Sequence, residues 1–168
     1  AAFIARVRVE GLRDLGAAAS PFNSFQTIQG LETLAIRMEQ HSKNALAISE
    51  WLESQNDVSW VNYPGLSSSK YKELAKKYLP KGQSGILTFG LKGGFNAGKK
   101  VADKTKLFSL LANIGDSKSL IIHPSSTTHS QLSSEEQKNT GVTEDLIRLS
   151  VGLENVDDLI DDLKQAIG

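Results

Sequence analysis

The hydrophobic and polar residues of this chain follow two different periods. Four short runs have the apolar character of strands, and two of them, 58–63 and 146–151, alternate residue by residue as half-buried strands do. The segments between the runs repeat every three to four residues, as amphipathic helices do. The predicted strands are 58–63, 85–91, 119–123 and 146–151. The predicted helices are 1–14, 20–55, 70–79, 96–106, 133–141 and 155–167. This pattern predicts an α/β fold with helices mainly on one face of a small four-stranded sheet.

The predicted helix 20–55 is long for a domain of this size. It would extend for roughly 50 Å at about 1.5 Å per residue, whereas a chain of 168 residues should have a radius of gyration of about 15 Å. We therefore expect the helix either to bend near Gly30 or to rest its first half on another part of the protein. In the second case Phe22, Phe25 and Ile28 should be exposed in this chain.

A single cation interrupts the last predicted strand. In the run 146–151 the odd-numbered positions are aliphatic, and Arg148 lies on the other face. Burying a guanidinium without an anionic partner is costly, so an acidic group should meet it. Arg148 would hold a ligand carboxylate with its planar fork, pair with one of the 19 acidic residues of the chain, or lie on a solvated sheet face.

Composition narrows the class of protein. A net charge of zero and a pI of about 7.1 give no electrostatic signature for binding nucleic acid or an anionic membrane. No apolar run approaches the ~20 residues that cross a bilayer, and we expect no signal peptide. The absence of cysteine excludes disulfides, thiolate metal sites and cysteine nucleophiles. We therefore expect a cytoplasmic protein without nucleic-acid or membrane partners.

Three other kinds of site are poorly supported by residue spacing. The glycines of 82–98 interrupt a strand and lack the spacing of a phosphate-binding loop. His123 and His129 have no third ligand at helical spacing, which is a weak indication of zinc. Ser119, His123 and Asp116 could be combined into a hydrolase triad, but no GxSxG elbow is present. We expect no metal site.

A series of ordered motifs runs along almost the whole chain. The motifs are Leu12-Arg13-Asp14-Leu15-Gly16, Ser20-Pro21-Phe22-Asn23, Gln29-Gly30-Leu31-Glu32-Thr33-Leu34, His41-Ser42-Lys43-Asn44-Ala45, Tyr63-Pro64-Gly65-Leu66, and the stretches 115–130 and 148–154. Together they resemble the C-terminal part of the enzymes of cysteine and methionine metabolism that use pyridoxal phosphate (PLP). That family includes cystathionine synthases and lyases, methionine γ-lyase and O-acetylhomoserine sulfhydrylase. The resemblance implies that the sheet is largely antiparallel.

The resemblance also implies a domain organisation. Residues 1–56 would form an N-terminal helix and a long interdomain helix, and residues 57–168 the C-terminal α/β domain on the substrate side. The PLP-binding domain, with its Schiff-base lysine, would lie before Ala1. Lys70 follows serines as the cofactor lysine of the family does, but it lies in a charged amphipathic helix and out of order with the other motifs. We therefore expect no cofactor-binding residue in this chain, and no activity from this chain alone.

The resemblance also implies which residues belong to the site. Arg148 matches the arginine that binds the α-carboxylate of the amino-acid substrate. Ser119 matches a serine whose hydroxyl lies beside the cofactor-bearing lysine, although it could equally be a strand-edge serine bonded to nearby backbone. Thr128 and His129 match a Thr-His pair that shapes the loop beside the substrate carboxylate, with a structural role favoured for His129. For His123 we expect a conformational role.

Within the family the chain is similar to the O-acetylhomoserine sulfhydrylases. Ile122 and Thr127 replace the acidic or amide residue and the methionine that synthases and lyases usually carry, and the stretch 111–116 agrees. This implies a homo-oligomeric enzyme, a tetramer in the family, that makes homocysteine from O-acetylhomoserine and sulfide by γ-replacement. The alternatives are a cystathionine γ-synthase, a methionine γ-lyase, or a non-catalytic binding or assembly module.

Overall fold

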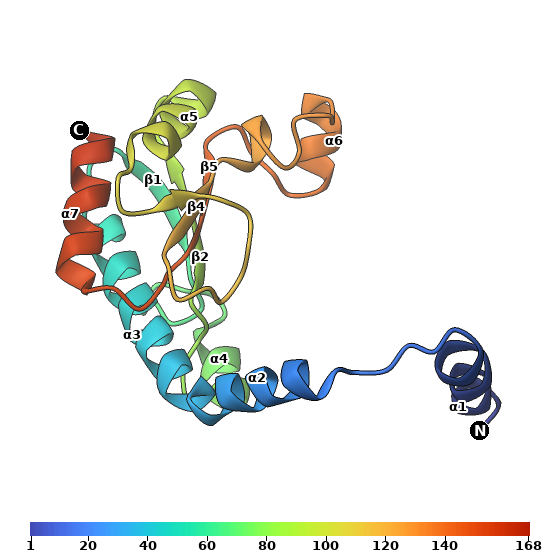
Figure 1. The fold of residues 1–168 in the computed structure, drawn as a ribbon. Helices are drawn as coiled ribbons and strands as arrows, with labels where there is room; N and C mark the ends of the chain where they lie inside the picture. The colour runs from blue at the N-terminus through green and yellow to red at the C-terminus, as the bar shows by residue number, and fades with distance from the viewer. The chain divides into compact units, whose positions relative to one another are not determined.

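The computed structural model describes residues 1–168 and divides the chain into two compact units, Ala1–Ala35 and Ile36–Gly168. The first unit contains helix α1 (Ala2–Arg6), the π-helix η1 (Val7–Asp14) and helix α2 (Pro21–Glu32), drawn in blue in Figure 1. None of these elements has a buried residue. This unit therefore has no hydrophobic core of its own.

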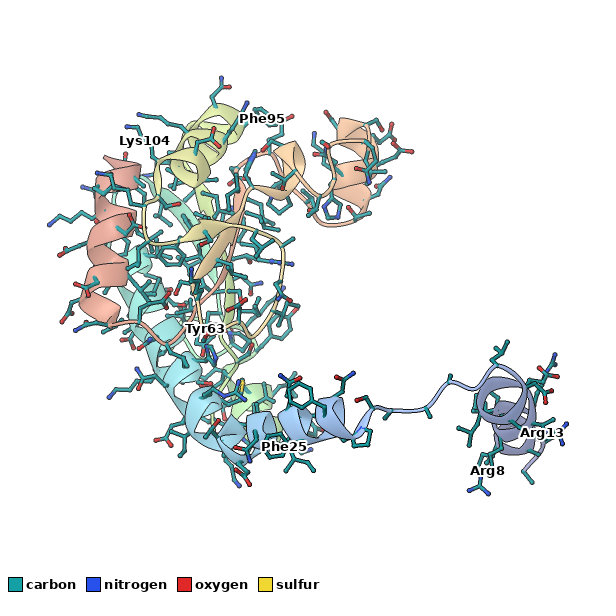
Figure 2. The ribbon with its side chains drawn as sticks, in the orientation of Figure 1. Arg8, Arg13, Phe25, Tyr63, Phe95 and Lys104 are labelled. Carbon is teal, nitrogen blue, oxygen red and sulfur yellow. The ribbon has the colours of Figure 1, made fainter.

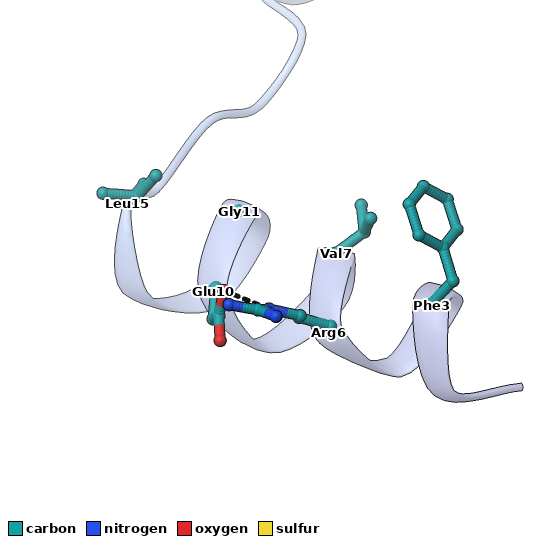
Figure 3. A pocket seen from close by; sticks show the side chains of 6 residues that line it. All are labelled: Phe3, Arg6, Val7, Glu10, Gly11 and Leu15. Carbon is teal, nitrogen blue, oxygen red and sulfur yellow. Dashed lines mark hydrogen bonds and ion pairs between the residues drawn. The ribbon is translucent and has the colours of Figure 1, made fainter.

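Apolar side chains are exposed throughout the first unit. Phe22 is 66% exposed, Phe25 57% and Ile28 55%, which confirms the exposure expected for the first half of the long helix. Figure 3 shows a shallow hollow on α1 and η1, where Phe3 and Val7 lie on one side of an ion pair of 2.8 Å between Arg6 and Glu10. Faces of this kind on a protein surface mark interaction sites.

The predicted helix 20–55 is interrupted once. Helix α2 ends at Glu32, Thr33 has φ −105° and ψ 3°, and helix α3 (Leu34–Glu53) begins at the next residue. The break lies three residues beyond the predicted position, Gly30. Three apolar residues of α3 are fully buried in the second unit, namely Ala45, Ile48 and Leu52. The compact units divide at 35/36, because the second half of the long helix belongs to the core of the second unit. The domain boundary at 56/57 that the family resemblance implies stays a prediction.

The second unit is built on a five-stranded sheet in the order β1-β2-β5-β4-β3. The strands are β1 (Val58–Asn62), β2 (Ile86–Leu91), β3 (Ser109–Leu110), β4 (Leu120–Ile122) and β5 (Leu146–Ser150). All pairs are antiparallel except β3 with β4. The prediction of four strands missed β3, since two residues are too short to show an alternation. The α/β class and the largely antiparallel sheet are confirmed.

Helices cover one face of this sheet. The second unit contains α3, α4 (Lys72–Tyr78), α5 (Gly94–Lys104), the 3-10 turn η2 (Pro124–Ser126), α6 (Ser134–Asn139) and α7 (Val156–Ile167). Side chains from α3, α5 and α7 pack with alternate residues of β2 and β5 in one core, which includes Ile48, Leu52, Leu87, Phe89, Val101, Ile147, Leu149, Leu159 and Leu163. Side chains alternate along a strand, so Arg148 and Ser150 of β5 lie on the sheet face opposite to this core.

Two buried side chains with polar groups, Tyr63 and Asp162, form hydrogen bonds with backbone groups next to this core. Figure 2 shows Tyr63 within the second unit; its hydroxyl donates to the Ser84 carbonyl at 2.9 Å, and burial raises the pKa of Tyr63 to about 12. The Asp162 carboxylate accepts backbone N–H groups of Lys106, Leu107 and Phe108 at 2.8–3.1 Å. Burial alone would raise the pKa of Asp162, but these hydrogen bonds outweigh it and lower the pKa. They fix the turn that leads from α5 into β3.

Candidate functional site

Arg148 lies in β5 on the sheet face that the helices leave uncovered. Its neighbours across the sheet are Thr88 on β2 and Ile122 on β4. The adjacent residues Ile147 and Leu149 are both fully buried in the core. Because side chains alternate along a strand, the same pattern that buries these two residues turns Arg148 to the opposite face. The alternation in the sequence predicted this placement.

The guanidinium of Arg148 is incompletely satisfied within the chain. Its Nη2 donates to the Asn113 carbonyl at 3.3 Å. Its Nε is buried and has no hydrogen-bond partner. No ion pair includes Arg148, so the possibility of an intrachain salt bridge is excluded. A buried donor without an acceptor is costly, and a charged one more so. The site therefore needs an acceptor that this chain does not supply, and an anion would suit it best.

The segment Leu111–Lys118 runs beside this part of β5. The backbone N–H of Gly115 donates to Ser150 Oγ at 3.3 Å. The Leu153 N–H donates to the Ser117 carbonyl at 2.9 Å. With the bond from Arg148 to Asn113, these contacts attach alternate residues of the segment to the end of β5. The segment thus forms one wall beside the guanidinium.

Ser119 is fully buried, and its hydroxyl is used within the chain. The hydroxyl donates to Glu154 Oε2 at 2.8 Å and accepts the Gly152 N–H at 2.8 Å, while the Ser119 N–H donates to Glu154 Oε1 at 2.8 Å. These contacts fit the second role considered for Ser119, that of a strand-edge serine that forms hydrogen bonds with nearby backbone. A place beside the cofactor lysine stays a prediction for Ser119.

Helix α3 secures the chain just after Arg148. The Nδ1–H of His41 donates to the Val151 carbonyl at 2.6 Å, and Asn44 Nδ2 donates to the carbonyls of Gly152 and Glu154 at 3.0 and 2.9 Å. Both side chains are only 1% exposed. The end of β5 is therefore fixed from two sides, by α3 and by Ser119.

Thr128 and His129 lie in the connection from β4 to β5. Thr128 is exposed, and its Oγ1 lies 2.9 Å from His129 Nδ1. Neither residue forms a hydrogen bond with Arg148 or Ser119, so the structure does not bring the predicted site residues together by direct contact. His123 is buried, with Nδ1 2.8 Å from Ser126 Oγ and Nε2 donating to the Glu144 carbonyl at 2.7 Å. These contacts fit the conformational role expected for His123.

Sequence reasoning assigned no role to the groups that contact these site residues. Asn113 contributes a backbone carbonyl, and Gly152 a backbone N–H, neither of which is visible in the residue type. Asn44 and Glu154 lie within the motifs quoted above. Asn44 could have been recognised, because it is a polar residue among the apolar positions of a helix, and a buried polar residue needs partners.

The side chains of this chain do not fit PLP by themselves. No lysine is buried, so none has the desolvated surroundings that make a lysine a good Schiff-base former.

No group of three or more His, Asp or Glu side chains is placed to hold a metal ion. No helix combines the length and apolar character needed to span a bilayer.

Comparison with known proteins gives a consistent assignment. The family model described as Cys/Met metabolism PLP-dependent enzyme matches residues 4–168. The O-acetyl-L-homoserine sulfhydrylase of Leptospira meyeri is 57% identical over 167 residues, which cover 99% of this chain and 38% of that protein. The homocysteine/cysteine synthase of Saccharomyces cerevisiae is 50% identical over 175 residues, covering 98% of this chain and 39% of that protein.

A solved structure agrees with the fold. The crystal structure of an O-acetylhomoserine (thiol)-lyase from Campylobacter jejuni, which contains N'-pyridoxyl-lysine-5'-monophosphate, superposes with a TM-score of 0.87 at 55% identity. The match covers 96% of this chain and 38% of that one. The chain thus spans well under half the length of the relatives it matches. Its sequence and fold show that it belongs to the Cys/Met metabolism PLP-dependent enzyme family.

Proposed function

We propose that this chain is the substrate-side part of a PLP-dependent sulfhydrylase that makes homocysteine from O-acetylhomoserine and sulfide. In this γ-replacement the Cγ–O bond of the substrate breaks, acetate leaves with the bonding electrons, and the sulfide sulfur forms the new Cγ–S bond. The similarity to O-acetylhomoserine sulfhydrylases over almost the whole chain supports this reaction. Because the chain spans 38% of the first relative, activity is proposed for the complete protein.

Arg148 carries the proposal. Its buried Nε has no acceptor, and no acidic side chain of the chain pairs with it. A carboxylate can accept two parallel N–H bonds from the guanidinium fork, which satisfies Nε and fixes the orientation of the bound molecule. In its proposed role Arg148 binds the α-carboxylate of the amino acid and so orients the bonds at Cα toward the reacting groups.

Ser119 and Thr128 have supporting roles in this proposal. Through Gly152 and Glu154, Ser119 fixes the end of β5 and the start of β4, so that Arg148 stays in place. Thr128, with His129, borders the substrate from the β4–β5 connection, where its exposed hydroxyl can meet a ligand. Neither assignment requires a proton transfer by these residues.

The residues that bind the cofactor would belong to a part of the protein outside this chain. No lysine here is buried, and the matched relatives are far longer. We propose that a PLP-binding domain covers the apolar side chains that the first unit exposes, among them Phe22, Phe25 and Ile28. We also propose that the complete protein is a homo-oligomer in the cytoplasm, a compartment in which disulfides are rare and which therefore suits the cysteine-free sequence of this chain.

The test uses the protein expressed from its complete reading frame. With O-acetylhomoserine we expect sulfide to give homocysteine, whereas cysteine in place of sulfide should give little cystathionine and methionine alone little 2-oxobutyrate. Product analysis by mass spectrometry distinguishes these outcomes. Cystathionine as the main product would indicate a γ-synthase, and 2-oxobutyrate from methionine a γ-lyase. No product with any substrate would favour a binding or assembly module.

A further inference from the structure

The connection between β4 and β5 forms an arm that extends from the sheet, drawn in orange in Figure 1. It leaves the sheet at Ile122, the residue paired with Arg148. His123 ties its two ends together, since its Nε2 donates to the Glu144 carbonyl at 2.7 Å. The arm is thus rooted beside the guanidinium, and it carries Thr128 and His129.

The arm is held in shape by polar contacts more than by apolar packing. Its helix α6 has one buried residue, Gln137, which is polar and 7% exposed. The N-terminus of α6 is closed by a capping box between Ser133 and Glu136. A six-residue helix is far too short to be stable alone, so its order depends on the contacts of its buried side.

The side-chain amide of Gln137 closes the loop that precedes α6. Its Oε1 accepts the Ser125 hydroxyl at 2.6 Å. Its Nε2 donates to the carbonyl of His129 at 2.8 Å and lies 3.3 Å from the carbonyls of Ser125 and Leu132. One side chain therefore joins the beginning, the middle and the end of the loop Ser125–Leu132. An apolar side chain of similar size would remove all of these hydrogen bonds and leave the hydroxyl of Ser125 without its acceptor.

We propose that Gln137 is a positioning residue that fixes the loop Ser125–Leu132 and thereby sets where Thr128 and His129 stand beside the substrate. The second half of this inference rests on the proposed function. Gln137 itself touches no substrate; it acts through the backbone of the loop. Loss of its amide should loosen the loop while the sheet and Arg148 stay in place, because α6 contributes no other buried side chain.

The first part of the test is hydrogen exchange, followed by mass spectrometry, on the protein expressed from its complete reading frame. In the variant Gln137→Leu we expect the hydrogen-bonded amides of Thr127, His129 and Leu132 to exchange on the order of tenfold faster, as expected for a loss of about 1.4 kcal/mol of local protection. The amides of β5 should be unchanged. Gln131→Leu is the matched control, because Gln131 is exposed in the same arm and makes no side-chain hydrogen bond.

The second part measures steady-state kinetics of the same variants. We expect Gln137→Leu to raise KM for O-acetylhomoserine about tenfold with a smaller change in kcat, and Gln131→Leu to match wild type. Unchanged exchange in the loop of Gln137→Leu would overturn the proposal. A loosened loop with wild-type KM and kcat would overturn its substrate-side half. An inactive wild-type protein would contradict the proposed function instead, and the exchange result would still decide the role of Gln137.

Discussion

Replacing Arg148 by alanine is expected to lower kcat/KM for O-acetylhomoserine by about 10²–10³-fold in the protein expressed from its complete reading frame. This range follows from the roughly 3–4 kcal/mol typical for removing one partner of a buried, hydrogen-bonded charge pair. The conservative variant Arg148→Lys keeps the charge but loses the planar fork, so we expect it to recover only part of the loss. Steady-state kinetics with varied O-acetylhomoserine and saturating sulfide measures both effects.

Two controls separate this effect from a general loss of structure. Lys104→Ala removes a cation from the exposed end of α5, seen in Figure 2, and should leave kcat/KM unchanged. Arg148→Ala should melt close to wild type, because the substitution also removes a buried donor without an acceptor. An Arg148→Ala protein that keeps kcat/KM within about threefold of wild type, a difference of only ~0.7 kcal/mol, would refute the assignment of Arg148.

Gly152→Ala is expected to destabilise the second unit by about 2–3 kcal/mol. An added Cβ would contact the Glu154 carboxylate and the Ser117 carbonyl closely and would lie 2.6 Å from the carbonyl carbon of Lys118. Backbone atoms cannot turn away as a flexible side chain can, so the segment beside Arg148 has to move or the bonds to Ser119 have to break. Urea denaturation of the chain, with a shift in midpoint at constant slope, measures the loss.

Gly11→Ala provides the matched comparison for this substitution. No atom lies within 4 Å of a Cβ added at Gly11, which is in the helical η1 segment. There we expect no loss of stability, since alanine is a better helix former than glycine by about 1 kcal/mol. Equal midpoints for Gly152→Ala and wild type would show that the approach of the two segments is loose enough to accept a methyl group.

Helices and strands could be predicted from the sequence where the repeat of apolar and polar residues was long enough to recognise. The strands of 85–91 and 146–151 were predicted within a residue, because alternate apolar residues of each enter one core. β3 was missed because two residues show no period. A bend near Gly30 was one of two alternatives for the long helix, because glycine is a strong local signal for a break. The backbone stays helical at Gly30, and the helix is interrupted at Thr33 instead.

The site could be predicted only in part, because its contacts depend on segments far apart in the chain. The alternation placed Arg148 on the face away from the core, but it could not decide between an internal salt bridge and an external ligand. That choice depends on which carboxylates the fold brings within ion-pair distance of Arg148, and it brings none of this chain. For Ser119 the motif suggested a catalytic position, whereas its partners Gly152 and Glu154 became apparent only in the folded chain.

A crystal structure of the complete protein with bound O-acetylhomoserine, or an unreactive analogue that keeps its α-carboxylate, tests the central claim most directly. We expect Nε and one Nη of Arg148 to donate to the two carboxylate oxygens at about 2.7–2.9 Å. An Asp or Glu from elsewhere in the protein bonded to Arg148, with the substrate carboxylate held by other residues, would contradict it.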